Sequence, residues 1–241
     1  GETVANGIMR RLPNTLLLMG VSAIVSIVFG ILLGVISAYK RGGIIDTGLV
    51  TSSLTTYSVP IFFIGWLVIF LFAVQLDWFP SGGTFPRAWG RNPPSNPLEI
   101  LFGRLSCIVL PGFTLFLFSV GGWILLTRAC VLENITEDYV VTARAKGLKQ
   151  RTVLYKHILK NASLPLITSV ALTFGFLISG AIITETLYNF DGMGLLIFGS
   201  LNPPDLPVLQ AVFYVIALCV IIANFVADLL YGIVDPRIRY G

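Results

Sequence analysis

Charge and histidine are both scarce in this sequence of 241 residues. Charged residues make up 12% of the chain, about half the share of an average soluble domain, whereas 55% of the residues are hydrophobic. A water-facing surface cannot be built from so few charges, so the composition indicates a membrane protein. The single histidine, His157, argues against a catalytic triad and against a His-based metal site.

Motifs that carry chemistry are missing as well. The phosphate-binding pattern GxxxxGK(S/T) does not occur, so nucleotide hydrolysis is not expected in this chain. Cys107 and Cys130 fall at opposite ends of one expected helix, about 35 Å apart, which is too far for a disulfide. We therefore expect a non-catalytic protein with no cofactor, no metal ion and no nucleic-acid partner.

Five long apolar stretches are present instead. Each is long enough to cross a hydrocarbon layer of about 30 Å, and none carries a charged residue at its centre. We predict an all-α membrane protein of one domain with five spanning helices in a lipid bilayer. The predicted spans cover about 15–39, 48–76, 105–127, 162–184 and 206–230, with a loop over 128–161.

Lysine and arginine are distributed unevenly between the two sides that this topology creates. The segments 40–49, 128–160 and 228–241 fall on one side and hold 11 of the 16 basic residues. By the positive-inside rule, the 128–160 loop and the C-terminus lie in the cytoplasm. The N-terminus then lies outside, and because no signal peptide precedes it, we expect a translocating element upstream.

The basic loop has the pattern of a capped helix followed by a second one. Thr136 is placed to cap the first helix, and Asp138 lies in its first turn, where negative charge favours the helix dipole. Arg144 lies in its last turn, and Gly147 follows at the position that favours a left-handed backbone. The expected second helix covers 151–160, with Leu154, Tyr155, Ile158 and Leu159 on its packed side and a turn into the fourth span at Asn161 and Pro165.

Two further segments have patterns that leave alternatives open. Pro60 interrupts the second span after several hydroxyl residues, and such a kink either lines a path or only shapes helix packing. The connection 185–205 is apolar for a loop, which favours a short helix that lies in the outer interface or dips back into the protein. Glu185 is expected at a membrane edge, where a carboxylate reaches water.

The loop resembles the cytoplasmic signature of ATP-binding cassette (ABC) importer permeases, in the version found in dipeptide, oligopeptide and nickel systems. Val141 and Thr142 depart from the general importer motif, but this departure is shared with the peptide branch. Other segments look like the first of the two permeases in those systems, with a MetI-like transmembrane domain. The matching residues are Glu137 to Val140, Thr142 to Leu148, His157, Asn161-Ala162, Leu164-Pro165, Arg11 to Thr15, Asp77 to Pro80, Gly82 and Asp235 to Gly241.

The resemblance implies how such a chain works and what accompanies it. It implies a second homologous permease, two cytoplasmic ATP-binding subunits and an extracytoplasmic solute-binding protein, with di- or oligopeptides as substrates. It also implies an N-terminal span and an external domain, which the family usually places before the Arg11 segment and which this sequence does not include. The implied ATPase-coupling residues are Thr142, Ala143, Arg144, Ala145, Lys146, Gly147 and Leu148. Candidates to line the translocation path are Tyr57, Ser58, Pro60, Thr184 and Glu185.

Two other function classes remain as alternatives. An ion-coupled secondary transporter or channel subunit predicts an intramembrane charge or an inverted repeat, and neither is clear in the sequence. A membrane-embedded enzyme predicts clustered His, Asp or Glu near one interface, and only scattered acids are present. The apolar spans do not distinguish dipeptides, oligopeptides, nickel complexes and sugars as the cargo.

Overall fold

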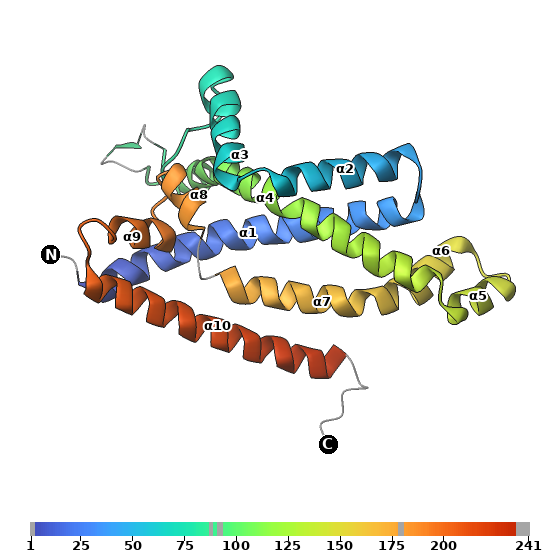
Figure 1. The fold of residues 1–241 in the computed structure, drawn as a ribbon. Coiled ribbons are helices and arrows are strands. Elements are labelled where there is room, and N and C mark those ends of the chain that lie inside the picture. The colour runs from blue at the N-terminus through green and yellow to red at the C-terminus, as the bar shows by residue number, and fades with distance from the viewer. Residues whose placement is uncertain (1–2, 87–88, 91–93, 178–180, 235–241) are drawn as a thin grey trace. The chain divides into compact units, whose positions relative to one another are not determined.

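The computed structural model describes residues 3–86, 89–90, 94–177 and 181–234, and the described part is helical without a β-strand (Figure 1). This confirms the all-α fold class. The C-terminal residues 235–241, for which a cytoplasmic position is predicted, lie outside the described ranges. The elements are α1 (Val4–Tyr39), α2 (Ile44–Ser58), α3 (Ile61–Val68), the π-helix η1 (Ile69–Gln75), α4 (Pro97–Ile135), α5 (Asp138–Ala145), α6 (Gln150–Thr152), the π-helix η3 (Val153–Ile158), α7 (Leu159–Phe176), α8 (Ile182–Leu187), α9 (Met193–Gly199) and α10 (Leu206–Val234).

Three described helices are long and apolar enough to cross a membrane. They are α1, α4 and the part of α10 over Leu206–Val226, and a fourth candidate arises if α2 and the α3–η1 segment form one broken span. The helices α1 and α4 extend beyond the predicted spans, and Arg128 still lies inside α4. The first part of the predicted loop, from Arg128 to Ile135, is therefore a helical continuation of α4.

The second predicted span is interrupted where the sequence places Pro60. The helix α2 ends at Ser58, and Pro60 stands at the N-terminal boundary of α3 with an extended backbone (φ −59°, ψ 136°). Proline cannot donate an amide hydrogen bond within a helix, so a break at this position is expected. The predicted kink is thus present as an interruption between two helices.

The fourth predicted span differs from the structure in both of its boundaries. The helix that starts at Gln150 continues through η3 into α7, and Pro165 lies inside α7, so the predicted turn at Asn161 and Pro165 is wrong. Ala162 and Leu166 are buried on either side of Pro165, and this packing offsets the hydrogen bond that proline removes. At its other end α7 stops at Phe176, and Thr184 belongs to the separate helix α8.

The chain forms two compact units, each with its own core. Unit 1 comprises Gly1–Val25, Val59–Phe118 and Gly175–Ile222, and in it α8 packs against both α3 and α9 (Figure 1). One core cluster of unit 1 surrounds Tyr188 and Phe190, and a second joins Ile8 to Met193 and Val212. These clusters place the part of the 185–205 connection up to Ile197 in the core of unit 1, whereas residues 201–205 are exposed.

Unit 2 comprises Ser26–Ser58, Ser119–Phe174 and Ala223–Gly241. Its core includes Val131 of α4, Val140 of α5 and Val153 of η3, all fully buried. In this unit α1 and α4 approach closely at Gly30, where a Cβ atom would lie 2.2 Å from Cβ of Trp123. Small residues are therefore needed at this contact, as expected for helix pairs in membranes.

Candidate functional site

The side chain of Glu185 is the centre of a buried polar cluster in unit 1. The residue is fully buried, and its carboxylate accepts three hydrogen bonds. The hydroxyl of Thr15 donates to Oε1 (2.8 Å), and the backbone N–H groups of Gly194 and Leu195 donate to Oε2 (2.6 and 3.2 Å). Burial raises the pKa of this carboxyl, while these hydrogen bonds oppose that rise.

The local chain path explains how the carboxylate reaches these donors. Asn189, which tolerates a positive φ, adopts 47° and turns the chain after α8, so that α9 starts beside Glu185. A Cβ atom on Gly192 would lie 2.4 Å from Oε2 of Glu185, and one on Gly194 would lie 2.6 Å from the Cα of Ile182. Glycine is therefore required at both positions, because any larger residue would overlap Glu185 or Ile182.

A second layer of polar contacts ties the same turn to the start of α1. Arg11 donates from Nε to Oδ1 of Asp191 (2.6 Å), and Asn14 donates from Nδ2 to the backbone oxygen of Asp191 (2.7 Å). Arg104 of α4 donates in turn to Oδ1 of Asn14 (2.7 Å). Thr15 completes the connection, because its hydroxyl also accepts the N–H of Met193 (2.8 Å). The segment from Arg11 to Thr15 is thus the main polar partner of the turn.

Tyr188 connects the turn to two further parts of unit 1. Its hydroxyl lies 2.7 Å from Oγ1 of Thr114 and donates to the carbonyl of Gly65 (3.3 Å). Its backbone oxygen accepts the N–H of Gly83 (2.8 Å). Burial raises the pKa of Tyr188 to about 12, so its hydroxyl stays neutral and remains a hydrogen-bond donor. The 185–195 turn is therefore fixed to α1, α3, α4 and the segment before α4.

The basic loop in unit 2 contains the predicted helix, with one difference at its start. The helix α5 begins at Asp138 after an extended Glu137, and Thr136 does not cap it, because the Thr136 hydroxyl donates back to the carbonyl of Glu133 (2.9 Å). The chain leaves α5 through Gly147, whose φ of +74° is the left-handed conformation that the sequence predicts.

One face of α5 is packed and the other is exposed. Val140 and Ala143 are buried, and α5 packs against η3. Six of the seven predicted coupling residues are exposed, and Ala143 is the exception. On η3 the packed residues are Val153 and Ile158, whereas Tyr155, which we expected on the packed side, is 66% exposed.

A buried ion pair lies elsewhere in unit 2. The carboxylate of Asp46 at the start of α2 accepts two hydrogen bonds from Arg128 of α4, from Nε (2.7 Å) and Nη2 (2.9 Å). It also accepts the hydroxyl of Ser37 and the N–H of Gly42 (2.9 Å). Asp46 is only 4% exposed. This pair fixes the α1–α2 connection to α4.

The structure separates the predicted path residues into two groups. Tyr57, Ser58 and Pro60 are exposed, as residues that line a path must be. Thr184 and Glu185 are buried within unit 1, so Glu185 does not reach water at a membrane edge as the sequence suggested. Its neighbours in space supply the donors that a buried carboxylate needs, which explains the difference.

Several residues of these networks have no role in the sequence-based interpretation. Thr15 and Asn14 belong to a segment that carries the family resemblance, which was the available signal, but their partners in the 185–195 turn lie 170 or more positions away. No pattern in the sequence pairs Asp46 with Arg128, which lies 82 positions away. Within the described ranges, no group of three His, Cys, Asp or Glu residues is placed to hold a metal ion.

Comparisons with known proteins agree with this architecture. The family described as the binding-protein-dependent transport system inner membrane component matches residues 30–240. The chain is 39% identical to the oligopeptide transport system permease protein AppB of Bacillus subtilis, with 100% of this chain and 73% of that protein covered. It is 36% identical to the di/tripeptide transport system permease protein DppB of Pseudomonas aeruginosa, with 99% and 74% covered.

Solved structures show the same fold at low sequence identity. A chain from inward-facing crystals of the MetNI methionine ABC transporter superposes with a TM-score of 0.71 at 16% identity, covering 94% of this chain and 95% of that one. A second crystal form of that transporter gives a TM-score of 0.68 at 18% identity, with 95% and 96% covered. The fold is therefore an all-helical, MetI-like membrane domain. This chain belongs to the family of inner membrane components of binding-protein-dependent transport systems, as a non-catalytic permease subunit of an ABC importer.

Proposed function

We propose that this chain is a permease for di- or oligopeptides. The observation that carries the proposal is the similarity, at 35–39% identity over nearly the whole chain, to relatives named as peptide permeases. In the proposed assembly a second homologous permease completes the translocation path, and a solute-binding protein delivers the cargo. Two cytoplasmic ATP-binding subunits drive the cycle.

The coupling segment in this proposal is Thr142 to Leu148. Burial of Val140 and Ala143 fixes α5 to η3, and the exposed side chains, including Arg144 and Lys146, face outward to meet an ATPase subunit. Ala143 then has a packing role rather than a docking role. A short helix fixed in this way passes an ATPase movement on as a rigid-body displacement, without a catalytic residue in this chain.

The proposed topology has five crossings and a cytoplasmic C-terminus. The helix α7 supplies the fourth crossing, since its 18 residues extend over about 27 Å. The cytoplasmic loop covers 128–161 in this proposal, and its first part, from Arg128 to Ile135, is the helical end of α4. Tyr57, Ser58 and Pro60 remain the candidates for the path, whereas Thr184 and Glu185 support the 185–195 turn.

The cargo is tested with the solute-binding protein of the proposed assembly. We expect thermal stabilisation of the binding protein by di- or oligopeptides and not by free sugars or nickel. Uptake of the best peptide into proteoliposomes that contain the whole complex then requires ATP inside the vesicles. Stabilisation by a sugar or nickel alone would contradict the peptide assignment and leave the permease assignment intact.

The coupling segment is tested at Gly147. A Cβ atom there meets nothing within 4 Å, so a substitution acts through the backbone, whose φ of +74° disfavours branched side chains. Gly147→Val is expected to strain the joint by about 1–3 kcal/mol and to reduce ATP-driven uptake severalfold. Gly147→Asn is the matched control, because asparagine tolerates this conformation. Equal uptake by both variants would contradict the role of this joint.

A further inference from the structure

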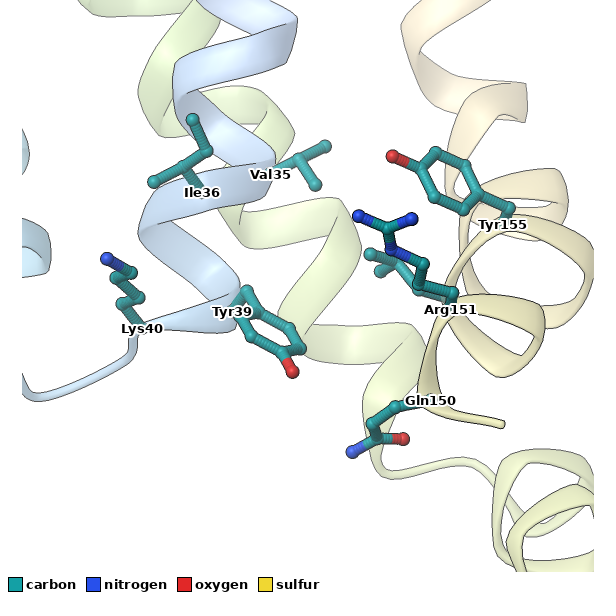
Figure 2. A pocket seen from close by; sticks show the side chains of 8 residues that line it. Val35, Ile36, Tyr39, Lys40, Gln150, Arg151 and Tyr155 are labelled. Carbon is teal, nitrogen blue, oxygen red and sulfur yellow. The ribbon is translucent and has the colours of Figure 1, made fainter. Parts of the chain in front are cut away.

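A hollow of about 280 Å³ lies in unit 2 between the end of α1 and the start of the α6–η3 helix (Figure 2). Val35 and Ile36 of α1 and Leu154 of η3 give it an apolar wall. Figure 2 shows the side chains of Arg151 and Tyr155 extending toward Val35 of α1. The hollow thus combines an apolar surface with a guanidinium and a phenolic hydroxyl.

The charged residues that line this hollow are all basic. Its lining residues include Lys40 and Arg151 and no Asp or Glu. Among the residues that the structure describes, no carboxylate forms an ion pair with Arg151. Both cations line the hollow, and in Figure 2 the side chain of Arg151 extends toward α1, whereas that of Lys40 lies on the other side of the end of α1. An anion is therefore the complementary ligand.

The position of the hollow along α1 indicates the source of that anion. The helix α1 is a candidate membrane span that ends at Tyr39, and Tyr39 itself lines the hollow. Val28, Leu32 and Ile36 form an apolar row on α1 that leads to the hollow, each more than 40% exposed. Tyrosine and basic side chains at the end of an apolar span are typical of the headgroup region of a bilayer.

We propose that this hollow binds the phosphodiester headgroup of an anionic phospholipid such as phosphatidylglycerol. The Arg151 guanidinium donates to the two non-bridging phosphate oxygens, and the Tyr155 hydroxyl donates to one of these same oxygens. The acyl chains lie along the apolar row of α1. The volume suits a headgroup and is below the range for a drug-sized ligand.

The proposal rests on the membrane placement of α1 in the proposed function, but not on the cargo or on the ATPase contact. A lipid held here contacts both α1 and the helix that follows the coupling segment. It therefore stabilises the contact between these helices, as any ligand stabilises the state to which it binds. The lipid composition of the membrane would then influence how ATPase movements reach the permease.

The test measures lipid retention by the purified, delipidated permease complex in native mass spectrometry. Phosphatidylglycerol is added, and phosphatidylcholine and inorganic phosphate are separate arms. We expect retained phosphatidylglycerol to fall severalfold in Arg151→Gln and to a smaller extent in Tyr155→Phe. Lys156→Gln is the matched control, because Lys156 is an exposed cation on the same helix that does not line the hollow.

Three results would overturn the proposal. They are an equal loss of lipid in Arg151→Gln and Lys156→Gln, equal retention of phosphatidylcholine, and displacement of the lipid by millimolar inorganic phosphate. If Arg151→Gln does not assemble, Arg151→Lys keeps the charge but loses the planar fork, and unchanged retention in Arg151→Lys and Tyr155→Phe together would count against the site. Lipid retention is measured without ATP or peptide. A failure of the transport assays would therefore contradict the proposed function without contradicting the lipid site.

Discussion

Among the residues that the structure describes, two carboxylates are buried, and they are stabilised in different ways. Glu185 in unit 1 has only uncharged donors, which are one hydroxyl and two backbone N–H groups. Asp46 in unit 2 has a guanidinium that donates twice, in addition to a hydroxyl and one N–H group. Both side chains are almost completely removed from solvent.

The difference determines what each carboxylate does for the fold. The donors of Glu185 come mainly from the backbone of α9, so its role is to fix the path of one turn. The donor of Asp46 comes from α4, 82 positions away in sequence, so its role is to hold separate helices together. Removal of a charged partner should therefore be more damaging in unit 2 than removal of a neutral partner in unit 1.

The largest effect is expected from Arg128→Ala. This change leaves the Asp46 carboxylate buried without its counter-charge, at a cost of about 3 kcal/mol in the free energy of unfolding. The value is at the low end for buried pairs, because the side chain of Arg128 is 26% exposed. Thermal unfolding of the detergent-solubilised protein measures the loss, and Arg41→Ala is the exposed control.

A double variant sharpens this prediction. Arg128→Met with Asp46→Leu removes both charges, so no unpaired charge remains buried. We expect it to recover a large part of the stability that Arg128→Ala loses. A double variant that is less stable than Arg128→Ala would show that the hydrogen bonds from Ser37 and Gly42 outweigh the ion pair.

A smaller effect is expected from Glu185→Ala in unit 1. The change leaves the N–H groups of Gly194 and Leu195 without an acceptor and costs about 2 kcal/mol. Glu185→Gln retains an oxygen for these donors, and its amide group faces the Thr15 hydroxyl, which can accept. Unfolding of the two variants side by side decides whether the hydrogen bonds or only the volume matter, since equal losses would exclude the hydrogen-bond explanation.

Arg128→Lys tests the geometry of the ion pair rather than its charge. Lysine keeps the positive charge but cannot reproduce the paired donation from Nε and Nη2 to the two oxygens of Asp46. We expect a loss of about 1 kcal/mol, well below that of Arg128→Ala. A loss as large as that of Arg128→Ala would mean that the fork geometry, and not the charge, stabilises this contact.

The smallest effect is a pH dependence from Glu185. Burial raises its pKa in the folded protein above the ordinary value of 4.5, so the folded state binds the proton more tightly than the unfolded chain. The free energy of unfolding should therefore fall as the pH rises from 4.5 through the raised pKa, with a slope of at most about 1.4 kcal/mol per pH unit. Glu185→Gln should lack this slope, and an identical pH profile in both proteins would contradict the assignment.

The long apolar helices and the short helix α5 were predictable to the extent that local pattern controls them. The left-handed Gly147 followed from charges and a glycine at helix-end spacing, and the break at Pro60 followed from the chemistry of proline. Pro165 shows the limit of such patterns, because the same residue type lies inside α7 where Ala162 and Leu166 pack into a core. Tertiary packing overrides a local sequence preference when the free energy gained by packing exceeds the cost of violating that preference.

By itself, the sequence determined that the protein belongs in a membrane, its family, and a short helix in the basic loop that ends at a left-handed glycine. Composition, the length of the uncharged stretches and a contiguous motif can all be read from the sequence without knowledge of distant contacts. Only the tertiary structure decided that Glu185 is buried, that Asp46 pairs with Arg128, and that Arg151 and Tyr155 lie together beside α1. Each of these depends on contacts with residues far apart in the chain, such as Thr15 for Glu185 and Arg128 for Asp46. The free energy of a buried charge is set by such neighbours in space.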